Sequence, residues 1–192
     1  LKPLPDRYAL FTVPEQDEHV KIIVVGAGII GMTHARTALM AGHEVVHLER
    51  DPAPQSASVR NFGLIWVSGR KSGEELDVAI RAREIWEEIH HENPELIFRG
   101  NGSLTLAQNE AELRVMEECL EKSDSHLRRW EILGKKETQK VNPALRGNFL
   151  ASLWCPLDGA VEPDSVLTSL RQGLSKHMNY IWRNSVDVVD IK

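Results

Sequence analysis

The sequence predicts an α/β fold that begins with a βαβ unit and continues into a second, α+β region. The β-branched run Val20–Val25 indicates a strand buried on both faces. A glycine-rich turn follows it, and the residues Ile29–Ala41 then read as a helix. The second apolar run, His43–Glu49, predicts a strand parallel to the first, since a helical crossover of this length joins parallel strands.

The composition is that of an ordinary globular protein. The 192 residues are 42% hydrophobic and 27% charged, and the formal net charge is −5. This mild negative charge offers no basic surface, so neither nucleic acid nor a membrane is expected as a partner. Two distant cysteines, Cys119 and Cys155, are interpreted as reduced core thiols of a cytoplasmic protein. No apolar run approaches the ~20 residues that span a bilayer.

Both ends of the chain predict an amino-terminal part of a longer protein. Leu1–His19 carries three prolines and no periodicity, and it is interpreted as a tail. At the other end, Ser185–Ile191 has the pattern of a strand with no partner strand after it. We therefore expect residues that complete the function to lie outside this sequence.

Between these ends, periodicity predicts further helices and strands. The polar Asp51–Arg70 segment, with its prolines and glycine, indicates a loop that runs into a short irregular segment. The later predicted elements are a helix over Glu74–His91, a strand over Gly102–Gln108, a helix opened by Asn109, a strand over Phe149–Pro156, a helix over Val161–Leu174, and strands over Tyr180–Asn184 and Ser185–Ile191.

Two of these helices have a recognisable surface or end. The helix over Glu74–His91 has acids and arginines on one face and an apolar stripe on the other, made of Val78, Ala82, Ile85, Trp86 and Ile89. Asn109 and Glu112 have the spacing of a capping box at the start of the next helix. That helix carries Leu113, Met116 and Leu120.

The turn of the βαβ unit has the spacing G-x-G-x-x-G, with Gly26, Gly28 and Gly31. Gly26 permits the tight turn, Gly28 leaves room for a pyrophosphate beside the backbone, and Gly31 lets the helix pack close to the strand. The first helical turn, which includes Ile29 and Ile30, presents free amides and a dipole that favour the diphosphate charge. The turn therefore predicts a Rossmann-like dinucleotide site.

An acid follows this turn at the end of the second predicted strand. The Glu49 carboxylate is placed to accept hydrogen bonds from both ribose hydroxyls of an adenosine, and it would repel a 2′-phosphate. The alternative is a glycine-rich turn without a ligand, with an ordinary surface acid. The motif alone separates neither FAD from NAD nor an enzyme from a non-catalytic nucleotide-binding remnant.

The segment Ser56–Trp66 bears on the choice between the two dinucleotides. A nicotinamide domain usually continues with another helix and a third parallel strand, whereas this chain enters a long loop. The loop supplies Arg60, Asn61 and small residues that allow close backbone approach to the far half of a long cofactor. The alternative is a plain connecting loop. Trp66 is the aromatic residue that could reach a flavin.

With these residues the chain resembles the D-amino-acid oxidase, sarcosine oxidase and glycine oxidase family of FAD-dependent oxidoreductases. The resemblance rests on "VVGAGIIGMTHARTALMAGHEVVHLERD" followed by "ASVRNFGLIW", and it continues in "RGNGSLTLAQNEAEL" and "LWCPLDGAVEPDSVLTSLRQGL". It covers Val20 to the end of the chain. The elements "THA" and "SVRNFG" are closest to a subgroup of amine-oxidising flavoproteins often associated with phosphonate breakdown.

The resemblance implies roles for individual residues. Gly26, Gly28 and Gly31 would border the FAD pyrophosphate, and Glu49 would bind the adenosine ribose. Further implied contacts are Arg50 beside the adenine, Arg60, Asn61 and Gly63 along the diphosphate or flavin edge, and Val186, whose backbone would touch the adenine. No residue is nominated as a catalytic base, because the family's carboxy-terminal half carries most substrate contacts.

The resemblance also implies domains and an activity. Residues 20–98 and 157–192 would form a discontinuous FAD-binding domain, and residues 99–156 part of a substrate domain inserted into it. Members of this family oxidise the C–N bond of an amine or amino acid by hydride transfer to the flavin, so a small amine is the expected substrate. The alternatives that the residues leave open are an NAD-dependent dehydrogenase and a non-catalytic remnant.

No metal site is expected. His90 and His91 are adjacent on a helix and cannot face one ion together, and His43 and His47 lie on one predicted strand at a spacing too long for a shared ion. Oligomeric state, substrate and electron acceptor are not encoded in any motif of the sequence.

Overall fold

The computed structural model describes residues 19–190, so the predicted tail falls on residues 1–18, outside the described residues. The described chain divides into two compact units, one made of residues 19–60 and 167–190 and the other of residues 61–166. These divisions lie near Arg60 and Leu167, whereas the predicted domain boundaries lie at residues 98 and 157. Compact units need not coincide with functional domains, so those boundaries stay a prediction.

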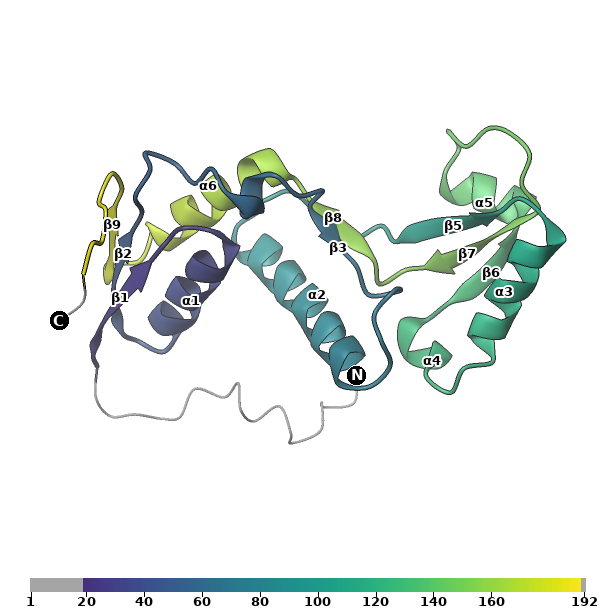
Figure 1. Cartoon of the computed structure of the whole chain (residues 1–192), viewed down its shortest axis with the longest axis horizontal. Helices are drawn as coiled ribbons and strands as arrows, with labels where there is room; N and C mark the ends of the chain where they lie inside the picture. The colour runs from purple at the N-terminus through teal and green to yellow at the C-terminus, as the bar shows by residue number, and fades with distance from the viewer. Residues whose placement is uncertain (1–18, 191–192) are drawn as a thin grey trace. The chain divides into compact units, whose positions relative to one another are not determined.

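The first unit contains the predicted βαβ motif. Strand β1 (Lys21–Val25), helix α1 (Ile29–Met40) and strand β2 (Glu44–Leu48) follow one another, and β1 and β2 pair in parallel. Strand β9 (Tyr180–Arg183) pairs in parallel with the other edge of β2, which gives the order β1-β2-β9 (Figure 1). The predicted parallel sheet is confirmed.

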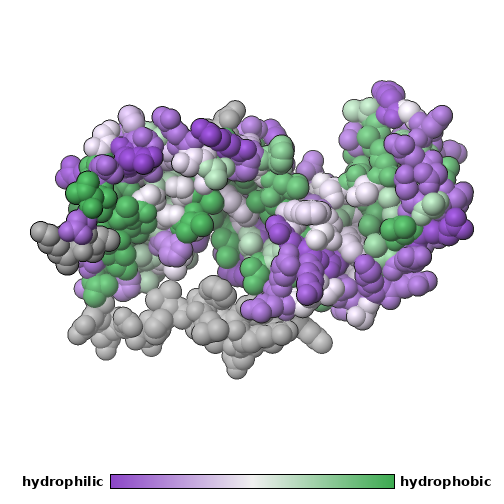
Figure 2. Space-filling view, viewed as in Figure 1, coloured by the Kyte–Doolittle hydropathy of each residue, from purple (hydrophilic) through white to green (hydrophobic). Residues whose placement is uncertain are grey.

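The prediction that the first strand is buried on both faces is wrong. In β1 the side chains of Ile23 and Val25 are 62% and 56% exposed. Strand β1 is an edge strand of its sheet. The face opposite to Ile23 and Val25 lies against α1, in which Met32, Ala35 and Leu39 are buried. A parallel strand is buried twice only where layers cover both faces of its sheet. Figure 2 shows hydrophobic residues at the surface of the sheet that contains β1.

The carboxyl end of the first unit also differs from prediction. Residues 185–190 form no strand, although their sequence alternates as a strand does. Ser185 has a positive φ of 57°, and the amide of Val186 donates to the Glu49 carbonyl at 3.0 Å. Alternation alone does not make a strand, because strands also need a partner edge.

The second unit contains an antiparallel sheet with the order β5-β7-β6. Its strands are β5 (Ser103–Ala107), β7 (Ala151–Cys155) and β6 (Glu131–Gly134). Helix α3 (Glu110–Leu120) packs on this sheet, and Met116 joins Ala107 and Leu153 in a common core. The predicted β5, α3 and β7 are confirmed.

The predicted capping box of α3 is confirmed in atomic detail. The Asn109 side chain accepts from the Glu112 amide at 3.0 Å, and the Glu112 carboxylate accepts from the Gln108 amide at 2.7 Å. The first bond occupies a backbone donor that the first turn of a helix leaves without a partner, and the second binds the Glu112 side chain to the residue before the N-cap.

A short sheet and a long helix complete the second unit. Strands β3 (Leu64–Ile65) and β4 (Phe98–Arg99) both pair antiparallel with β8 (Gly159–Val161). The long helix is α2 (Glu74–Glu92). The remaining elements are η2 (Ala57–Val59), α4 (Ser125–Arg128), α5 (Lys135–Val141) and α6 (Pro163–Leu174), which returns the chain to the first unit.

Helix α2 lies where it was predicted, but its buried residues match the predicted apolar stripe only in part. Ile89 of the stripe is buried, while Val78 is 48% exposed and Ala82 is exposed. Leu76 and Arg83, which are outside the stripe, are buried. The Arg83 guanidinium lies over the Phe98 ring at 5.2 Å and donates to the Leu157 carbonyl at 2.9 Å. A long side chain with an apolar stem can therefore occupy a core position that hydropathy assigns to the surface.

No helix within residues 19–190 has both the length and the apolar character needed to cross a membrane.

Candidate functional site

The candidate site is the turn between β1 and α1, which we call the glycine corner (Gly26–Gly31). Gly26 has a φ of 96°, a conformation that side chains other than glycine rarely adopt. Its amide donates to the Leu48 carbonyl at 2.8 Å, which continues the β1–β2 ladder to the turn. Gly28 has extended backbone and is the N-cap of α1. The corner therefore changes direction within two residues and directs the amino end of α1 outward.

Gly31 is required by packing. A Cβ added there would lie 1.8 Å from the Gly26 carbonyl oxygen and 3.3 Å from Nε2 of His47. Both distances are shorter than ordinary van der Waals contact. The third glycine of the motif therefore lets the first turn of α1 rest on the carbonyl that ends β1, as the sequence predicted.

Glu49 is directed toward the glycine corner. Its Oε2 accepts from the Ala27 amide at 2.7 Å, and its Oε1 accepts from the Asp51 amide at 3.1 Å. The residue is only 9% exposed. A buried carboxylate held by two amides has a fixed orientation, because such charge-assisted bonds are short and directional.

A cavity of about 390 Å³ lies beside this arrangement, within the first unit. This volume lies in the range of ~300–1,000 Å³ that is typical of small-molecule pockets. The cavity is lined by Val25, Gly26, Ala27, Gly28, Glu49, Arg50, Asp51, Pro54, Gln55, Ser56, Ser58, Val186, Asp187 and Val188.

The structure brings together part of the predicted set and leaves part of it apart. Gly26, Gly28, Glu49, Arg50 and Val186 all line the cavity. The Val186 amide binds the Glu49 carbonyl, so the end of the chain forms one wall directly beside the acid.

The other predicted residues do not line this cavity. Arg60 and Asn61 are exposed, and Asn61 accepts from the Gly63 amide at 2.6 Å in a tight local turn. Gly63 is buried with a φ of 67°, and an added Cβ would lie 2.0 Å from the Val161 carbonyl oxygen. Ile29 and Ile30 do not line the cavity either: the Ile29 amide donates to the Ser58 hydroxyl, and Ile30 is 71% exposed. The flavin-edge assignments of Arg60, Asn61 and Gly63 remain predictions.

Sequence reasoning missed Ser58. Its hydroxyl accepts from the Ile29 amide at 3.0 Å, at the amino end of α1. An added Cβ on Gly28 would lie 3.1 Å from this hydroxyl oxygen. Ser58 thus supplies a hydroxyl at the mouth of the helix, where anions are favoured. The run of small polar residues "SAS" was the only sequence signal for it.

Sequence reasoning also missed His47, which it considered only as a metal ligand. Its ring is fully buried, with Nε2 3.0 Å from the Gly26 carbonyl and Nδ1 3.0 Å from the Tyr180 hydroxyl. Burial lowers the pKa of His47, against smaller opposing effects of the Gly26 carbonyl and the Glu49 charge. Within residues 19–190, no three His, Cys, Asp or Glu side chains are grouped to hold a metal ion.

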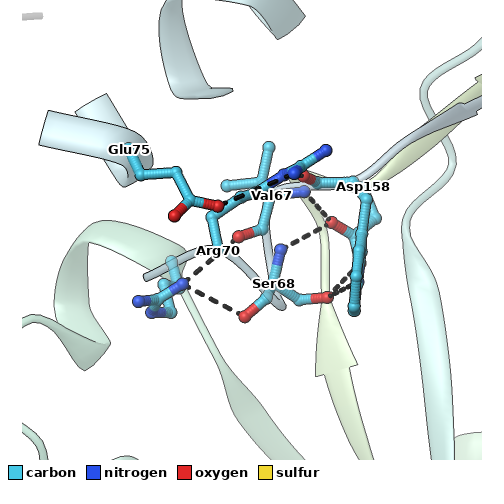
Figure 3. A network of polar contacts seen from close by, with 7 residues as sticks. Val67, Ser68, Arg70, Glu75 and Asp158 are labelled. Atoms are coloured by element: carbon cyan, nitrogen blue, oxygen red, sulfur yellow. Dashed lines mark hydrogen bonds and ion pairs between the residues drawn. The ribbon is translucent and has the colours of Figure 1, made fainter. Parts of the chain in front are cut away.

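The second unit holds a different polar cluster, centred on Asp158 (Figure 3). Its Oδ1 accepts from the amides of Val67 and Ser68 at 2.7 and 2.9 Å. Its Oδ2 accepts from the hydroxyls of Ser68 and Ser103, both at 2.6 Å. From the opposite side, Arg128 donates to the Val67 and Ser68 carbonyls at 3.2 and 3.1 Å. This cluster fixes the loop that follows β3.

Trp66 lies beside that loop and is 45% exposed. Its indole N–H donates to the Ser68 hydroxyl at 2.7 Å, and the Arg70 guanidinium lies 5.8 Å from its ring. Trp66 and Trp86 also line a cavity of about 340 Å³ within the second unit. The expectation that Trp66 reaches a flavin remains a prediction.

The glycine corner fits the diphosphate end of a dinucleotide. Gly31 permits the close turn, α1 points its amino end outward, and the first turn of any helix leaves amides without helical partners. The Glu49 carboxylate lies on the wall of the same cavity, where ribose hydroxyls could donate to it. Ser58 also reaches the corner, and its side chain is small and polar.

Comparison with known proteins agrees with this fit. The sequence profile of the family described as FAD dependent oxidoreductase matches residues 21–191. One component of the opine oxidase of Rhizobium meliloti is 24% identical over 169 residues, which are 82% of this chain and 45% of that protein. The bifunctional protein MnmC of tRNA 5-methylaminomethyl-2-thiouridine biosynthesis from Magnetococcus marinus is 24% identical over 188 residues, covering 91% of this chain and 27% of that protein.

Solved structures show the same fold. Glycine oxidase from Bacillus cereus superposes with a TM-score of 0.73 at 20% identity, over 90% of this chain and 49% of that chain. L-proline dehydrogenase from P. horikoshii superposes with a TM-score of 0.71 at 21% identity, over 88% of this chain and 45% of that chain. The chain thus spans less than half the length of each of these relatives.

Proposed function

Because the chain belongs to the family of FAD-dependent oxidoreductases, we propose that its first unit holds the adenosine diphosphate end of FAD in an enzyme that oxidises the C–N bond of an amine or amino acid. The observation that carries this proposal is the position of Glu49. Its carboxylate is 2.7 Å from the Ala27 amide of the glycine corner and lines the adjoining cavity. An acid there recognises a ribose with free hydroxyls beside a diphosphate.

The residues of the first unit have separate roles in binding FAD. The amino end of α1 stabilises the diphosphate charge, and the Ser58 hydroxyl adds a hydrogen-bonding group beside it. Glu49 would accept from the ribose, and Arg50 and the Val186 backbone, which line the same cavity, would contact the adenine. When bound, FAD supplies the acceptor for a hydride from the carbon next to the amine nitrogen.

The choice of amines as substrates is supported by the names of the relatives. Glycine oxidase and L-proline dehydrogenase act on amino acids, and the L-amino acid deaminase from Proteus vulgaris superposes with a TM-score of 0.72. An opine oxidase component is among the sequence relatives. The narrower assignment, to amine oxidation in phosphonate breakdown, remains a prediction. Two free thiols, Cys119 and Cys155, support the proposed cytoplasmic location.

The first experiment tests the cofactor on the full-length protein. The purified protein is expected to show the visible absorption bands of a flavin, and stripped protein is expected to recover them with FAD. Titration with NAD in place of FAD tests the alternative dinucleotide. A protein that binds NAD and takes up no FAD would contradict the proposal.

A matched pair of variants tests the role of Glu49. Glu49→Gln removes the charge, and we expect the Kd for FAD to rise about tenfold, the equivalent of about 1.4 kcal/mol. Glu44→Gln changes a half-buried acid at the start of β2 that pairs with Lys21, and it should leave the Kd unchanged. Equal affinities of the two variants would remove Glu49 from the site.

The second experiment tests the reaction. Anaerobic mixing with a panel of glycine, proline, other amino acids and simple amines should bleach the flavin absorption with at least one of them. Alcohols and hydroxy acids serve as the control substrates. Bleaching by hydroxy acids alone would retain the FAD site and contradict the proposed amine chemistry.

A further inference from the structure

A single peptide group in the glycine corner is held at both ends by side chains that project from the end of β2. The Gly26–Ala27 peptide donates its N–H to Oε2 of Glu49 at 2.7 Å. The carbonyl of the same peptide lies 3.0 Å from Nε2 of His47. One acid and one imidazole, two residues apart in the sequence, therefore fix the plane of one peptide group.

The strand geometry explains this pairing. Alternate residues of a strand point to the same face, so His47 and Glu49 project together toward α1. The parallel register sets His47 opposite Val24, two residues before Gly26. The imidazole thus reaches the Gly26 carbonyl, one residue after β1, and the carboxylate reaches the Ala27 amide.

The proton positions on His47 follow from its partners. The Gly26 carbonyl can only accept, so Nε2 must carry the hydrogen. In the neutral ring Nδ1 then accepts, and its partner at 3.0 Å is the Tyr180 hydroxyl. Tyr180 belongs to β9, on the other side of β2, and is 9% exposed. The Gly26 carbonyl therefore selects the Nε2–H tautomer, and the buried Tyr180 hydroxyl supports it by donating to Nδ1.

The corner needs this restraint because little else limits its rotation. Gly26 has no side chain, and an added Cβ would have no described atom within 4 Å. A glycine rotates its adjoining peptides more freely than other residues do. A flip of the Gly26–Ala27 peptide would point the carbonyl at the cavity and turn the amide away. A carbonyl oxygen there would repel a diphosphate.

Ligand binding would load only one of the two restraints. Ribose hydroxyls that donate to Glu49 would share its carboxylate with the Ala27 amide. The ring of His47 is 0% exposed, so Nε2 faces no ligand donor or acceptor. The imidazole therefore holds the peptide in the same way with and without a ligand.

We propose that His47, with the Tyr180 hydroxyl behind it, is a positioning residue that fixes the Gly26–Ala27 peptide and thereby sets the affinity of the corner for the diphosphate of FAD. This inference rests on the proposed function, since it assigns a role within the same site. His47 would touch no atom of the cofactor.

The test compares three variants of the full-length protein by the Kd for FAD and by urea unfolding. His47→Leu removes the donor, and we expect a rise in Kd of about tenfold, as for one lost hydrogen bond in a rigid site. His47→Gln can place an amide N–H near the former Nε2, and it should recover most of the affinity. Leu39→Ala lowers stability at the far end of α1, and it should leave the Kd unchanged.

Two further measurements keep the outcome clear. Binding of ADP, which carries the diphosphate without the flavin, should weaken in parallel with FAD in His47→Leu. Nitrogen NMR of the apoprotein should show His47 as the Nε2–H tautomer in the wild type, and Tyr180→Phe should shift the Nδ1 resonance, because that nitrogen loses its donor. If His47→Leu fails to fold, Tyr180→Phe takes its place in the comparison, with an expected rise in the Kd for FAD of about threefold.

The possible results separate the two proposals. Wild-type protein that binds neither FAD nor ADP would overturn the proposed function. Wild-type protein that binds FAD, with His47→Leu no weaker than Leu39→Ala, would overturn only the role of His47. A wild-type His47 that is not the Nε2–H tautomer would overturn it as well, and so would Tyr180→Phe with an unchanged Nδ1 resonance and an unchanged Kd.

Discussion

Each unit contains a loop held by one buried acid and one buried base. In the first unit, Glu49 binds the amide of the Gly26–Ala27 peptide and His47 binds its carbonyl. In the second unit, Asp158 binds the amides of Val67 and Ser68, and Arg128 binds their carbonyls. The same chemistry fixes both loops.

The two loops differ in how many hydrogen bonds the buried acid accepts from the protein itself. Asp158 is 1% exposed and accepts four hydrogen bonds, two of them from serine hydroxyls. Glu49 is 9% exposed, accepts from the amides of Ala27 and Asp51, and lines a cavity. A saturated carboxylate can only stabilise the fold, whereas a carboxylate with spare acceptor capacity beside a cavity can also bind a ligand.

The basic residues of the two loops differ in charge. Arg128 is always charged, pairs with Asp124 at 2.9 Å and lies over the Trp130 ring at 4.8 Å. His47 is held neutral by burial and donates one hydrogen bond. A neutral ring adds no positive charge beneath Glu49, so the carboxylate keeps its full attraction for hydroxyl donors.

Asp158→Ala should change the stability of the protein most. The change leaves two buried amides without acceptors, and we expect the free energy of unfolding to fall by about 3 kcal/mol. The Kd for FAD at the glycine corner should stay within about twofold of the wild type, because mutations at separate sites act independently. Urea unfolding and FAD titration measure the two effects. A large loss of FAD affinity in folded Asp158→Ala would contradict the distinction between an acid that only stabilises its loop, Asp158, and an acid that also binds a ligand, Glu49.

Gly31→Ala is expected to affect both stability and binding. The new methyl group would overlap the Gly26 carbonyl, which forces the corner apart and lowers the free energy of unfolding by about 2 kcal/mol. FAD affinity should fall at least about tenfold, because the amides of the corner move with it. Thr37→Ala, at an exposed position of the same helix, is the control. Unaltered FAD binding by Gly31→Ala would show that the corner is not the binding element.

A weaker effect is the pH dependence carried by His47. Its pKa is lowered in the folded chain, while the unfolded chain has the ordinary value of 6.5. Below that value the unfolded chain binds the proton more readily, so stability is fully present above pH 6.5 and is lost as the pH falls toward the folded pKa. The slope reaches at most about 1.4 kcal/mol per pH unit for one proton.

His47→Gln should remove this component of the acid sensitivity, as measured by urea unfolding at a series of pH values. The charges nearest the ring are those of Glu49, and Tyr180 is its other polar neighbour. An identical pH profile in both proteins would mean that His47 is protonated with equal ease in the folded and unfolded chain. The contrast with the permanently charged Arg128 would then be lost.

Much of the fold followed from local patterns. The βαβ unit, the capping box at Asn109 and the helix opened by Pro163 were predicted within a few residues of their observed bounds. Each depends on neighbours in sequence, such as glycine spacing or a side chain that bonds an amide three residues later. Apart from the seven-residue helix α5, the elements that were missed, among them β3, β8 and β6, are two to four residues long. Segments so short carry no readable period.

Prediction failed where a distant partner decided the outcome. Ser185–Ile191 alternates like a strand, yet over the described residues its backbone binds Glu49 and extends no sheet. Arg83 has the composition of a surface residue, yet the Phe98 ring and the Leu157 carbonyl hold it in the interior. Neither partner lies near enough in sequence to leave a pattern.

Residue spacing was sufficient to establish the parallel βαβ unit, the glycine corner and the acid at the end of β2, because these features lie within about one supersecondary unit. The surroundings of the corner became known only from the folded chain. Folding brings Ser58 to the amino end of α1, the Val186 backbone to Glu49, and Tyr180 to His47 from 133 residues away. Hydrogen bonds of that reach depend on how strands are ordered in a sheet, which no local pattern records.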